Sequence, residues 1–374
     1  MKSADSKQLF VPGRLCLFGE HSDWASEFGL HSGYCIVVGT DQGLHATARA
    51  CNEFIVEGPT VHEHPEDRST DVESTTTVGQ SPGTAVPGLS APEMLRLPWH
   101  SDALLQAAAD QEEFFRYTAG VACLMREHRG VRGGIHLTIA PFDLPLKKGV
   151  SSSAAVCILV AKAFNAVYDL NLLPHELMEL AYQGEKLTGS RCGRMDQACI
   201  YGKTPVLLTF APPAVPRVEP VFPARAIEMF FVDMAGQKDT VAILSDLRHA
   251  YELHPRLQRA LGADNEQIVR EAYAALEAGN AARLGDLMNE AQRLFDAHVA
   301  PHSPHLASPL LHKLLSQEEL QGLVLGGKGV GSQGDGTAQF VARSAAARDI
   351  ATAFIQRTFP HMRCFALTIP AGGT

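Results

Sequence analysis

The feature that most constrains this chain is a glycine and three serines that lead directly into a strongly apolar helical segment. From Gly149 the sequence reads GVSSSAAVCILVAKAF. Its apolar residues recur at positions 156, 159, 160, 163, 164 and 167, which is the spacing of one helix face. The pattern predicts the clearest helix of the chain, with small residues at its start.

The start of such a helix is a natural anion site. Its first backbone N–H groups have no partner in the helix, and the helix dipole adds positive charge there. Gly149 allows close approach of the backbone, and the hydroxyls of 151–153 can donate to phosphate oxygens or ligate magnesium. One serine would be an ordinary N-cap, but three after Lys-Lys-Gly favour phosphate binding. No G-x-x-x-x-G-K-[ST] run occurs, so this is not a Walker loop.

A second constraint is the segment VPGRLCLFGEHSDW near the start of the chain. Apolar residues alternate up to a glycine, and Glu20, His21 and Asp23 then follow within four positions. The alternation over 9–20 and 33–51 predicts an early hairpin that brackets this acidic turn. Trp24 could stack on a ligand ring, although aromatic residues near turns most often serve packing.

Two further carboxylates lie near a tight run of small residues. Asp196 belongs to LTGSRCGRMDQ, between a predicted helix over 175–187 and a strand over 205–210. It is either a structural cap or a proton acceptor, and beside a phosphate site it could take a proton from an attacking hydroxyl. Glu185 on the preceding helix could hold magnesium. For each residue both interpretations stay open at this point.

A second glycine-rich run, GGKGVGSQGDGTAQF, covers 326–340 and holds six glycines in eleven residues. It does not match the dinucleotide pattern G-x-G-x-x-G followed by a helix. Such density indicates backbone that passes close to a ligand or to another strand. A flexible linker is the alternative, but the apolar strand that follows makes it less favoured.

Mixed strands and helices without regular βαβ alternation predict two α+β domains. The boundary is expected at the proline-rich run over 211–216, which gives domains 1–210 and 211–374. Residues 57–100, rich in Ser, Thr, Gly and Pro, are expected to form a long loop. Other expected helices are 114–126, 240–260, 265–278 and 281–298, and other expected strands are 134–140, 229–233, 338–342 and 365–369.

Charge and hydropathy exclude several classes of protein. The net charge of −9 argues against nucleic-acid binding, and no apolar run is long enough to cross a membrane. The polar N-terminus has no secretory apolar core, so a cytoplasmic location is expected. The eight cysteines form no C-x-x-C pair and are expected to be reduced. The histidines of HVAPHSPH (298, 302 and 305) are expected to be loop residues rather than metal ligands.

Together these runs resemble the GHMP kinase superfamily, whose members phosphorylate small molecules with ATP and magnesium. VPGRLCLFGEHSDW is similar to the galactokinase signature P-G-R-x-x-L-x-G-E-H-x-D, and CGRMDQ to the segment that carries the galactokinase base. LKKGVSSSAA resembles the family phosphate loop and GGKGVGSQGDGTAQF its third motif. The resemblance extends from residue 11 to about 345, and its motifs occur in the family order.

The resemblance implies a ribosomal S5 domain 2-like N-terminal domain and a ferredoxin-like C-terminal domain, with the active site between them. Asp196 would be the catalytic base toward a sugar hydroxyl, and Arg14 would keep it ionised and stabilise the transferring phosphoryl group. The residues implied to line the sugar site are Glu20, His21, Asp23, Trp24 and Gly193. Those implied to hold ATP are Lys148, Gly149, Val150, Ser151, Ser152, Ser153 and Ala154, with Ser152 and Glu185 on magnesium.

The chain departs from the family pattern in ways that bear on the substrate. Trp24 and Ala25 replace the usual Tyr-Asn, Ser245 stands where a sugar-contacting Tyr falls, and Gln333 occupies a usual glycine. These changes leave the reaction class unaltered and extend the expected substrates beyond galactose to a heptose or an octose. The expected activity is phosphorylation of the C1 hydroxyl by a monomer or homodimer. The alternatives are a catalytically silent sugar sensor and a kinase of a non-sugar alcohol such as mevalonate.

Overall fold

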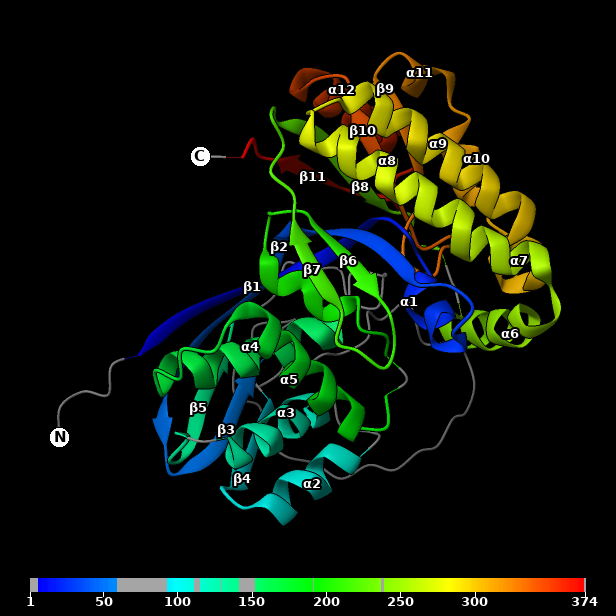
Figure 1. The fold of residues 1–374 in the computed structure, drawn as a ribbon. Helices are drawn as coiled ribbons and strands as arrows, with labels where there is room; N and C mark the ends of the chain where they lie inside the picture. Colours follow the sequence, from blue (N-terminus) through cyan, green and yellow to red (C-terminus); the bar gives the residue numbers. More distant parts are fainter. Residues whose placement is uncertain are drawn as a thin grey trace, which may run out of the picture.

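Two β-sheets, each covered by helices, make up the molecule (Figure 1). The computed structural model describes residues 6–58, 93–110, 115–128, 130–140, 152–190, 192–236 and 239–372. Four of the predicted nucleotide-binding residues, Lys148, Gly149, Val150 and Ser151, lie outside this description. The mixed α+β architecture predicted from the sequence is confirmed.

The first sheet is seven-stranded and contains the predicted hairpin. Strand β1 (Lys7–Phe18) pairs antiparallel with β2 (Gly33–Cys51), which runs through the middle of the sheet. The remaining strands are β3 (Glu53–Gly58), β4 (Glu93–Pro98), β5 (Gly134–Ile139), β6 (Val206–Phe210) and β7 (Arg217–Pro220). Their order is β4-β3-β5-β2-β6-β7, with β1 also paired to β2 and only β3 and β5 parallel in the described sheet.

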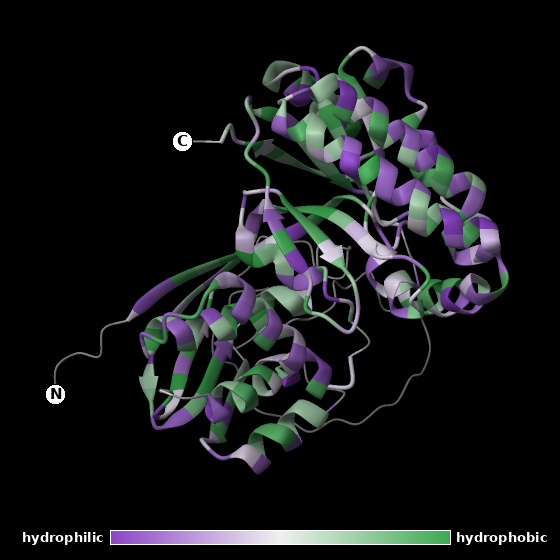
Figure 2. Cartoon of the chain, in the orientation of Figure 1, coloured by the Kyte–Doolittle hydropathy of each residue, from purple (hydrophilic) through white to green (hydrophobic). Residues whose placement is uncertain are grey.

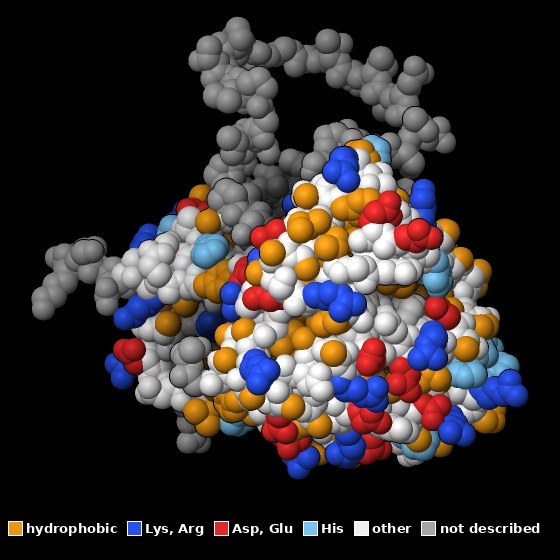
Figure 3. Space-filling view, turned by 90° about the horizontal axis from the view of Figure 1, so that it is seen from above, with side chains coloured by type: hydrophobic (Ala, Val, Ile, Leu, Met, Phe, Trp, Pro, Cys, Tyr) orange, Lys and Arg blue, Asp and Glu red, His pale blue; other side chains and the backbone are white. Residues whose placement is uncertain are grey.

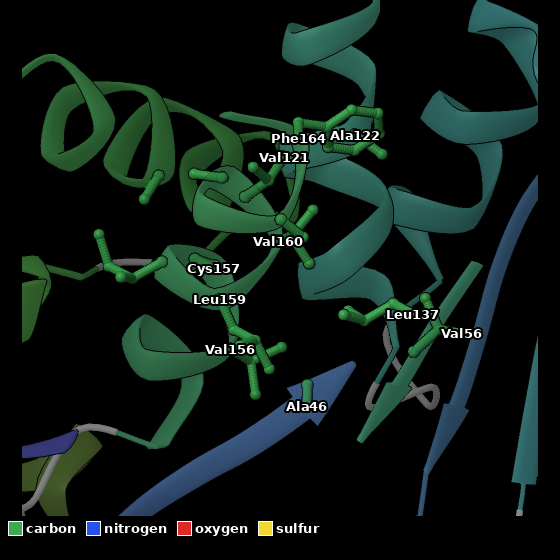
Figure 4. Packing of buried hydrophobic residues seen from close by; sticks show 14 of the residues in the cluster. Ala46, Val56, Val121, Ala122, Leu137, Val156, Cys157, Leu159, Val160 and Phe164 are labelled. Atoms are coloured by element: carbon green, nitrogen blue, oxygen red, sulfur yellow. The ribbon is translucent and has the colours of Figure 1, made fainter. Parts of the chain in front are cut away.

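The helix that begins with the serine run is the centre of the first hydrophobic core. Helix α4 (Ser152–Val167) is apolar around much of its circumference and packs on the sheet and on neighbouring helices. Figure 4 shows Val156, Val160 and Phe164 among side chains of the sheet and of helix α3. The other helices of this layer are α2 (Ser101–Ala109), α3 (Arg116–Glu127) and α5 (Pro174–Leu187). Because α4 packs on several sides, most of its length is buried in this core.

The second sheet is antiparallel, in the order β11-β8-β10-β9. Its strands are β8 (Ile227–Asp233), β9 (Val324–Gly329), β10 (Thr337–Ala342) and β11 (Arg363–Ile369). Alternation separates its faces: Phe231 joins the core shared with β1, β2, α8 and α9, whereas Phe230 joins the core under α10 to α12. The helices are α6 (Thr240–Leu253), α7 (Pro255–Arg259), α8 (Asn265–Glu277), α9 (Ala281–His298), α10 (Pro309–Leu315), α11 (Glu318–Gln321) and α12 (Ala345–Thr358).

The glycine-rich third motif is partly explained by strand packing. Gly326 lies on β9 against the backbone of α9, where a Cβ would come within 2.0 Å of the Gly285 carbonyl oxygen. Glycine is therefore required for this close contact between helix and strand. The linker interpretation of the motif is wrong, because β9 and β10 pair on either side of the turn.

Three sequence predictions need correction. Within the expected loop over 57–100, residues 93–98 form β4, because Leu95 and Leu97 pack on the core while the strand pairs with β3. The expected helix over 240–260 ends at Leu253, since Pro255 cannot continue it and begins α7 instead. Residues 217–220 form β7 on the first sheet, so that sheet extends beyond the expected boundary at 210.

The surface carries no strong segregation of charge on the face seen in Figure 3, where acidic and basic side chains are interspersed. Figure 2 shows the outer helices alternating between polar and apolar residues, as expected for helices with one buried side. Among the described residues, none of the helices combines the length and apolarity needed to cross a bilayer.

Candidate active site

A strained turn at the end of β1 directs the acidic residues of the first motif. Gly19 has φ 92°, and a Cβ there would lie 2.1 Å from the carbonyl oxygen of Tyr34. His21 is also left-handed, with φ 67°, and the short helix α1 (Ser22–Ala25) follows at once. The Ser22 hydroxyl donates to the carbonyls of Gly19 (2.7 Å) and Tyr34 (2.8 Å). This turn holds Glu20 and Asp23 in separate surroundings.

Arg14 and Asp196 form an ion pair across 182 residues of sequence. Arg14 lies on β1, and Asp196 is the first residue of a 3-10 helix, η3 (Asp196–Tyr201). The Arg14 side chain is 4% exposed, whereas that of Asp196 is 29% exposed. Burial alone would lower the pKa of the Arg14 guanidinium, but the Asp196 carboxylate outweighs it and leaves that pKa raised. Arg14 therefore stays charged beside Asp196, and the Asp196 carboxyl group is partly open to a ligand.

Asp23 faces the same place. A Cβ on Gly193 would lie 1.8 Å from Asp23 Oδ2, so the Asp23 carboxylate rests directly on the Gly193 backbone. Burial, and then the negative charge of Asp196, raise the pKa of Asp23 to about 6, while Arg14 opposes the shift. Of the residues predicted to surround a sugar, Asp23 and Gly193 thus lie beside the Arg14–Asp196 pair.

Glu185 connects this group of residues to the start of α4. Its carboxylate accepts hydrogen bonds from Ser153 Oγ (2.9 Å) and from Gln197 Nε2 (2.8 Å), and the residue is 2% exposed. Burial, and then the charge of Asp196, raise the pKa of Glu185 to about 7. Ser152 begins α4, and Ala154 is fully buried in its first turn. Carboxylate and serine oxygens are ligands that Mg²⁺ accepts, so this corner fits the predicted magnesium site.

Glu20 has a different environment from Asp23. It forms a buried ion pair with Lys328 of β9, and the two side chains are 6% and 1% exposed. Lys328 Nζ also donates to the Gly329 carbonyl at 2.8 Å. Sequence reasoning missed Lys328, although a lone lysine among the glycines of the third motif was a signal that could have identified it.

His21 and Trp24 belong to an aromatic group under the turn. Trp24 Nε1 donates to His21 Nδ1 at 3.0 Å, and the His21 ring stacks on Phe295 of α9 at 5.9 Å between centroids. Trp24 is 4% exposed and meets Tyr251 edge-on at 5.7 Å. These are the contacts expected if Trp24 serves packing, and a role in sugar binding stays a prediction for both residues.

Comparison with known proteins gives one family match. Residues 116–203 match the GHMP kinases N terminal domain, a range that includes the start of α4, Glu185 and Asp196. A galactokinase from Roseiflexus sp. (strain RS-1) is 26% identical over 316 residues, or 75% of this chain and 70% of that protein. A galactokinase from Chloroflexus aggregans is 27% identical over 189 residues, or 50% of this chain and 38% of that protein.

Solved structures agree with the fold over the whole length. Mevalonate kinase from L. major in complex with R-mevalonate has a TM-score of 0.69 at 19% identity, covering 100% of this chain and 99% of that one. Lactococcus lactis galactokinase complexed with galactose has a TM-score of 0.69 at 18% identity, covering 99% and 95%. At these identities the likeness establishes the two-domain GHMP kinase fold and leaves the substrate open.

The matched domain and the sequence relatives support an ATP-dependent small-molecule kinase, and the fold is that of GHMP kinases. The curated relatives to which the sequence is similar are galactokinases.

Proposed function

We propose that this protein transfers the γ-phosphoryl group of ATP to the C1 hydroxyl of a sugar. The observation that carries the proposal is the ion pair of Arg14 with a partly exposed Asp196, beside Asp23 and Gly193. A carboxylate that is charged, oriented and accessible is what a general base toward a hydroxyl requires. The galactokinase relatives supply the sugar as the class of acceptor.

Asp196 accepts the proton of the attacking hydroxyl as its oxygen approaches phosphorus. Arg14 holds Asp196 Oδ1, which leaves Oδ2 for the substrate. The positive charge of Arg14 also stabilises the negative charge that builds up on the transferring phosphoryl group. Asp23 hydrogen-bonds neighbouring sugar hydroxyls and fixes the acceptor in line, so that positioning provides much of the rate acceleration.

The nucleotide phosphates bind at the start of α4. The proposed contacts are Lys148, Gly149, Val150, Ser151, Ser152, Ser153 and Ala154. Mg²⁺ bound by Ser152 and Glu185 would offset the charge of the β- and γ-phosphates. The hydrogen bond of Ser153 to Glu185 supports this assignment, because it holds the carboxylate at the helix end where the phosphates are expected.

The sugar is proposed to be galactose-like, or a heptose or octose of an antibiotic or polysaccharide pathway. Trp24, Ala25 and Ser245 replace residues of the galactokinase pattern, and Ser245 lies on an exposed side of α6. A non-sugar alcohol such as mevalonate is the second candidate acceptor, favoured by the structural likeness to mevalonate kinases.

The test is ADP release by the purified protein with ATP and a panel of acceptors. The panel contains hexoses, uronic acids, amino sugars, heptoses, octose phosphates and mevalonate. We expect turnover with at least one free sugar and a product whose phosphorus couples to the anomeric proton in ³¹P NMR. Asp196→Ala, prepared in parallel, controls for contaminating kinases and is expected to bind ATP without turning it over.

Each other outcome has its own meaning. Turnover with mevalonate alone would replace the sugar by a non-sugar alcohol. ATP binding without turnover on any acceptor would identify a catalytically silent sensor. Phosphorus attached away from the anomeric carbon would contradict the C1 assignment.

A further inference from the structure

Gln333 of the third motif has two energetically unfavourable features, one in its backbone and one in its side chain. Its backbone is left-handed, with φ 62°, at a position where glycine would be unstrained. Its side chain is buried, and within the described part of the chain its Oε1 atom has no hydrogen-bond partner. Strain and an unsatisfied buried acceptor together usually mark a functional position.

The unsatisfied oxygen borders a small recess in which Glu20, Asn265, Lys328 and Gln333 are the polar residues among mostly apolar ones. Phe18, Gly19 and Glu20 line it from the first motif, Lys328 and Gln333 from the third, and α8, α9 and the short helix η4 (Ala260–Asp264) complete its walls. Its volume is about 40 Å³, enough for a water molecule or a hydroxymethyl group. Gln333 Oε1 lies over Gly329, where a Cβ would come within 2.7 Å of it.

The charge of the recess limits what it can hold. Lys328 and Glu20 neutralise each other, and both are closed off from solvent. A carboxylate or phosphate would compete with Glu20 for Lys328 and would leave a buried carboxylate unpaired, which is costly. A neutral hydroxyl has no such cost, because it can donate to Gln333 Oε1 without disturbing the ion pair.

The recess adjoins the proposed sugar site. Glu20 and Asp23 belong to the same four-residue turn. The buried Cys16 thiol is within electrostatic range of both groups: after burial, Glu20 and Asp23 raise its pKa, while Arg14 and Lys328 lower it. Phe295 lines the recess and stacks on His21, so α9 also borders both places.

We propose that this recess receives the terminal hydroxyl of the sugar and that Gln333 is a specificity-determining residue, its Oε1 accepting that hydroxyl's proton in a hydrogen bond. The proposal rests on the proposed sugar kinase activity. It adds that the protein recognises the terminal hydroxyl of the acceptor sugar. The recess therefore selects sugars that end in a neutral hydroxymethyl group over their deoxy and uronic acid analogues.

The experiment compares kcat/KM for the sugar that turns over best in the panel and for its analogue without the terminal hydroxyl, D-galactose and 6-deoxy-D-galactose being the first pair. The wild-type protein is expected to prefer the hydroxylated sugar by roughly 10- to 100-fold, since a site with a buried polar partner rejects analogues that leave it unpaired. Gln333→Met keeps the side-chain length without the acceptor and should reduce the preference to below about 3-fold.

Gln339→Met is the matched control. Gln339 is equally buried on β10, and its Oε1 is also without a partner among the described residues. Its Nε2, however, donates to the carbonyls of Cys16 (2.7 Å) and Leu17 (3.3 Å), and the residue does not line the recess. This variant should keep the sugar preference and should melt at a lower temperature, because two buried carbonyls lose their donor. Gln333→Met should melt no lower than wild type, because it removes an unsatisfied acceptor.

The outcomes separate the two proposals. An unchanged preference in Gln333→Met, no preference in the wild type, or a melting point that falls as far as that of Gln339→Met would overturn the role of Gln333. Absence of turnover on every sugar in the panel would instead overturn the proposed function.

Discussion

Two carboxylate–cation pairs involve β1 and the turn that follows it, and the two pairs differ sharply in solvent exposure. Arg14–Asp196 joins β1 of the first sheet to η3, and its carboxylate is 29% exposed. Glu20–Lys328 joins the turn after β1 to β9 of the second sheet, and its side chains are 6% and 1% exposed. The carboxylate of the open pair is accessible to a ligand, whereas the closed pair is shielded from solvent and holds the turn after β1 against β9.

The closed pair belongs to a larger attachment between the two sheets. Lys328 and Gln339 are opposite each other on β9 and β10, so both point to the same face of the second sheet. Gln339 donates to the backbone at the end of β1, and Lys328 binds the turn that follows. Two adjacent side chains of the third motif therefore hold the segment that carries residues proposed to bind the sugar.

The largest expected effect on stability comes from breaking the closed pair. Lys328→Met leaves the Glu20 carboxylate buried without its cation, which should lower the free energy of unfolding by about 3–5 kcal/mol. Urea denaturation followed by circular dichroism measures this. The double variant Glu20→Gln with Lys328→Met should recover more than half of the loss. A single variant within about 1 kcal/mol of wild type would mean that the pair does not stabilise the attachment.

Asp23, beside the open pair, should make the stability of the protein depend on pH. The pKa of Asp23 is raised to about 6 from an ordinary value of 3.8, so between these values the folded state binds more protons than the unfolded state. Stability from this group is present below about pH 4 and is lost as the pH rises through 6. Asp23→Asn should therefore be more stable than wild type at pH 8, by on the order of 2 kcal/mol, and equally stable at pH 4.

Thermal melts of both proteins across this range make the measurement. Glu185, whose pKa is raised to about 7, is retained in the variant and should leave a remaining pH dependence centred above that of Asp23. Parallel curves for Asp23→Asn and wild type would show that Asp23 does not titrate in this window.

Gly193→Ala tests the close contact between Gly193 and Asp23, on which the proposed sugar site depends. The new methyl group would lie 1.8 Å from Asp23 Oδ2 and must displace that carboxylate. We expect KM for the sugar to rise by roughly 10-fold, about 1.4 kcal/mol, with little change in KM for ATP. Gly322→Ala is the control, because a Cβ there has no neighbour within 4 Å. An equal rise in both KM values would indicate a general distortion instead.

The smallest effect is expected from a third pair, on the surface. Arg259 and Asp264 lie 3.0 Å apart, with side chains 75% and 24% exposed. Asp264→Asn should change the free energy of unfolding by less than about 1 kcal/mol, because solvent screens the interaction. A loss as large as that of Lys328→Met, measured in the same urea series, would show that burial does not determine how much each pair contributes to the free energy of unfolding.

The sequence predicted the local parts of this structure better than the distant ones. Strict alternation predicted β1 and β2, and helical spacing predicted α4, because both patterns arise within one element. The strand over 93–98 was missed because it is short and follows a segment of loop-like composition. The predicted helix over 240–260 was too long because helical spacing continues on both sides of Pro255, where α6 has ended and α7 begins.

The candidate site divides in the same way. Asp196 and Arg14 were predicted as partners because both lie in motifs of a known family. The pairing of Glu20 with Lys328 spans 308 residues, and no local pattern links the two. The unsatisfied amide of Gln333 depends on packing among β9, α8 and α9, which a sequence does not reveal.

The most direct test of the account is made with Asp196→Asn and the sugar found in the panel. The amide keeps the shape and can still accept from Arg14, but it cannot take the proton of the sugar hydroxyl. We predict that kcat falls by roughly 10²- to 10⁴-fold while ATP binding, measured by calorimetry, stays within about 3-fold of wild type. Turnover near the wild-type rate would contradict the account, because the open pair would then not be the centre of the chemistry.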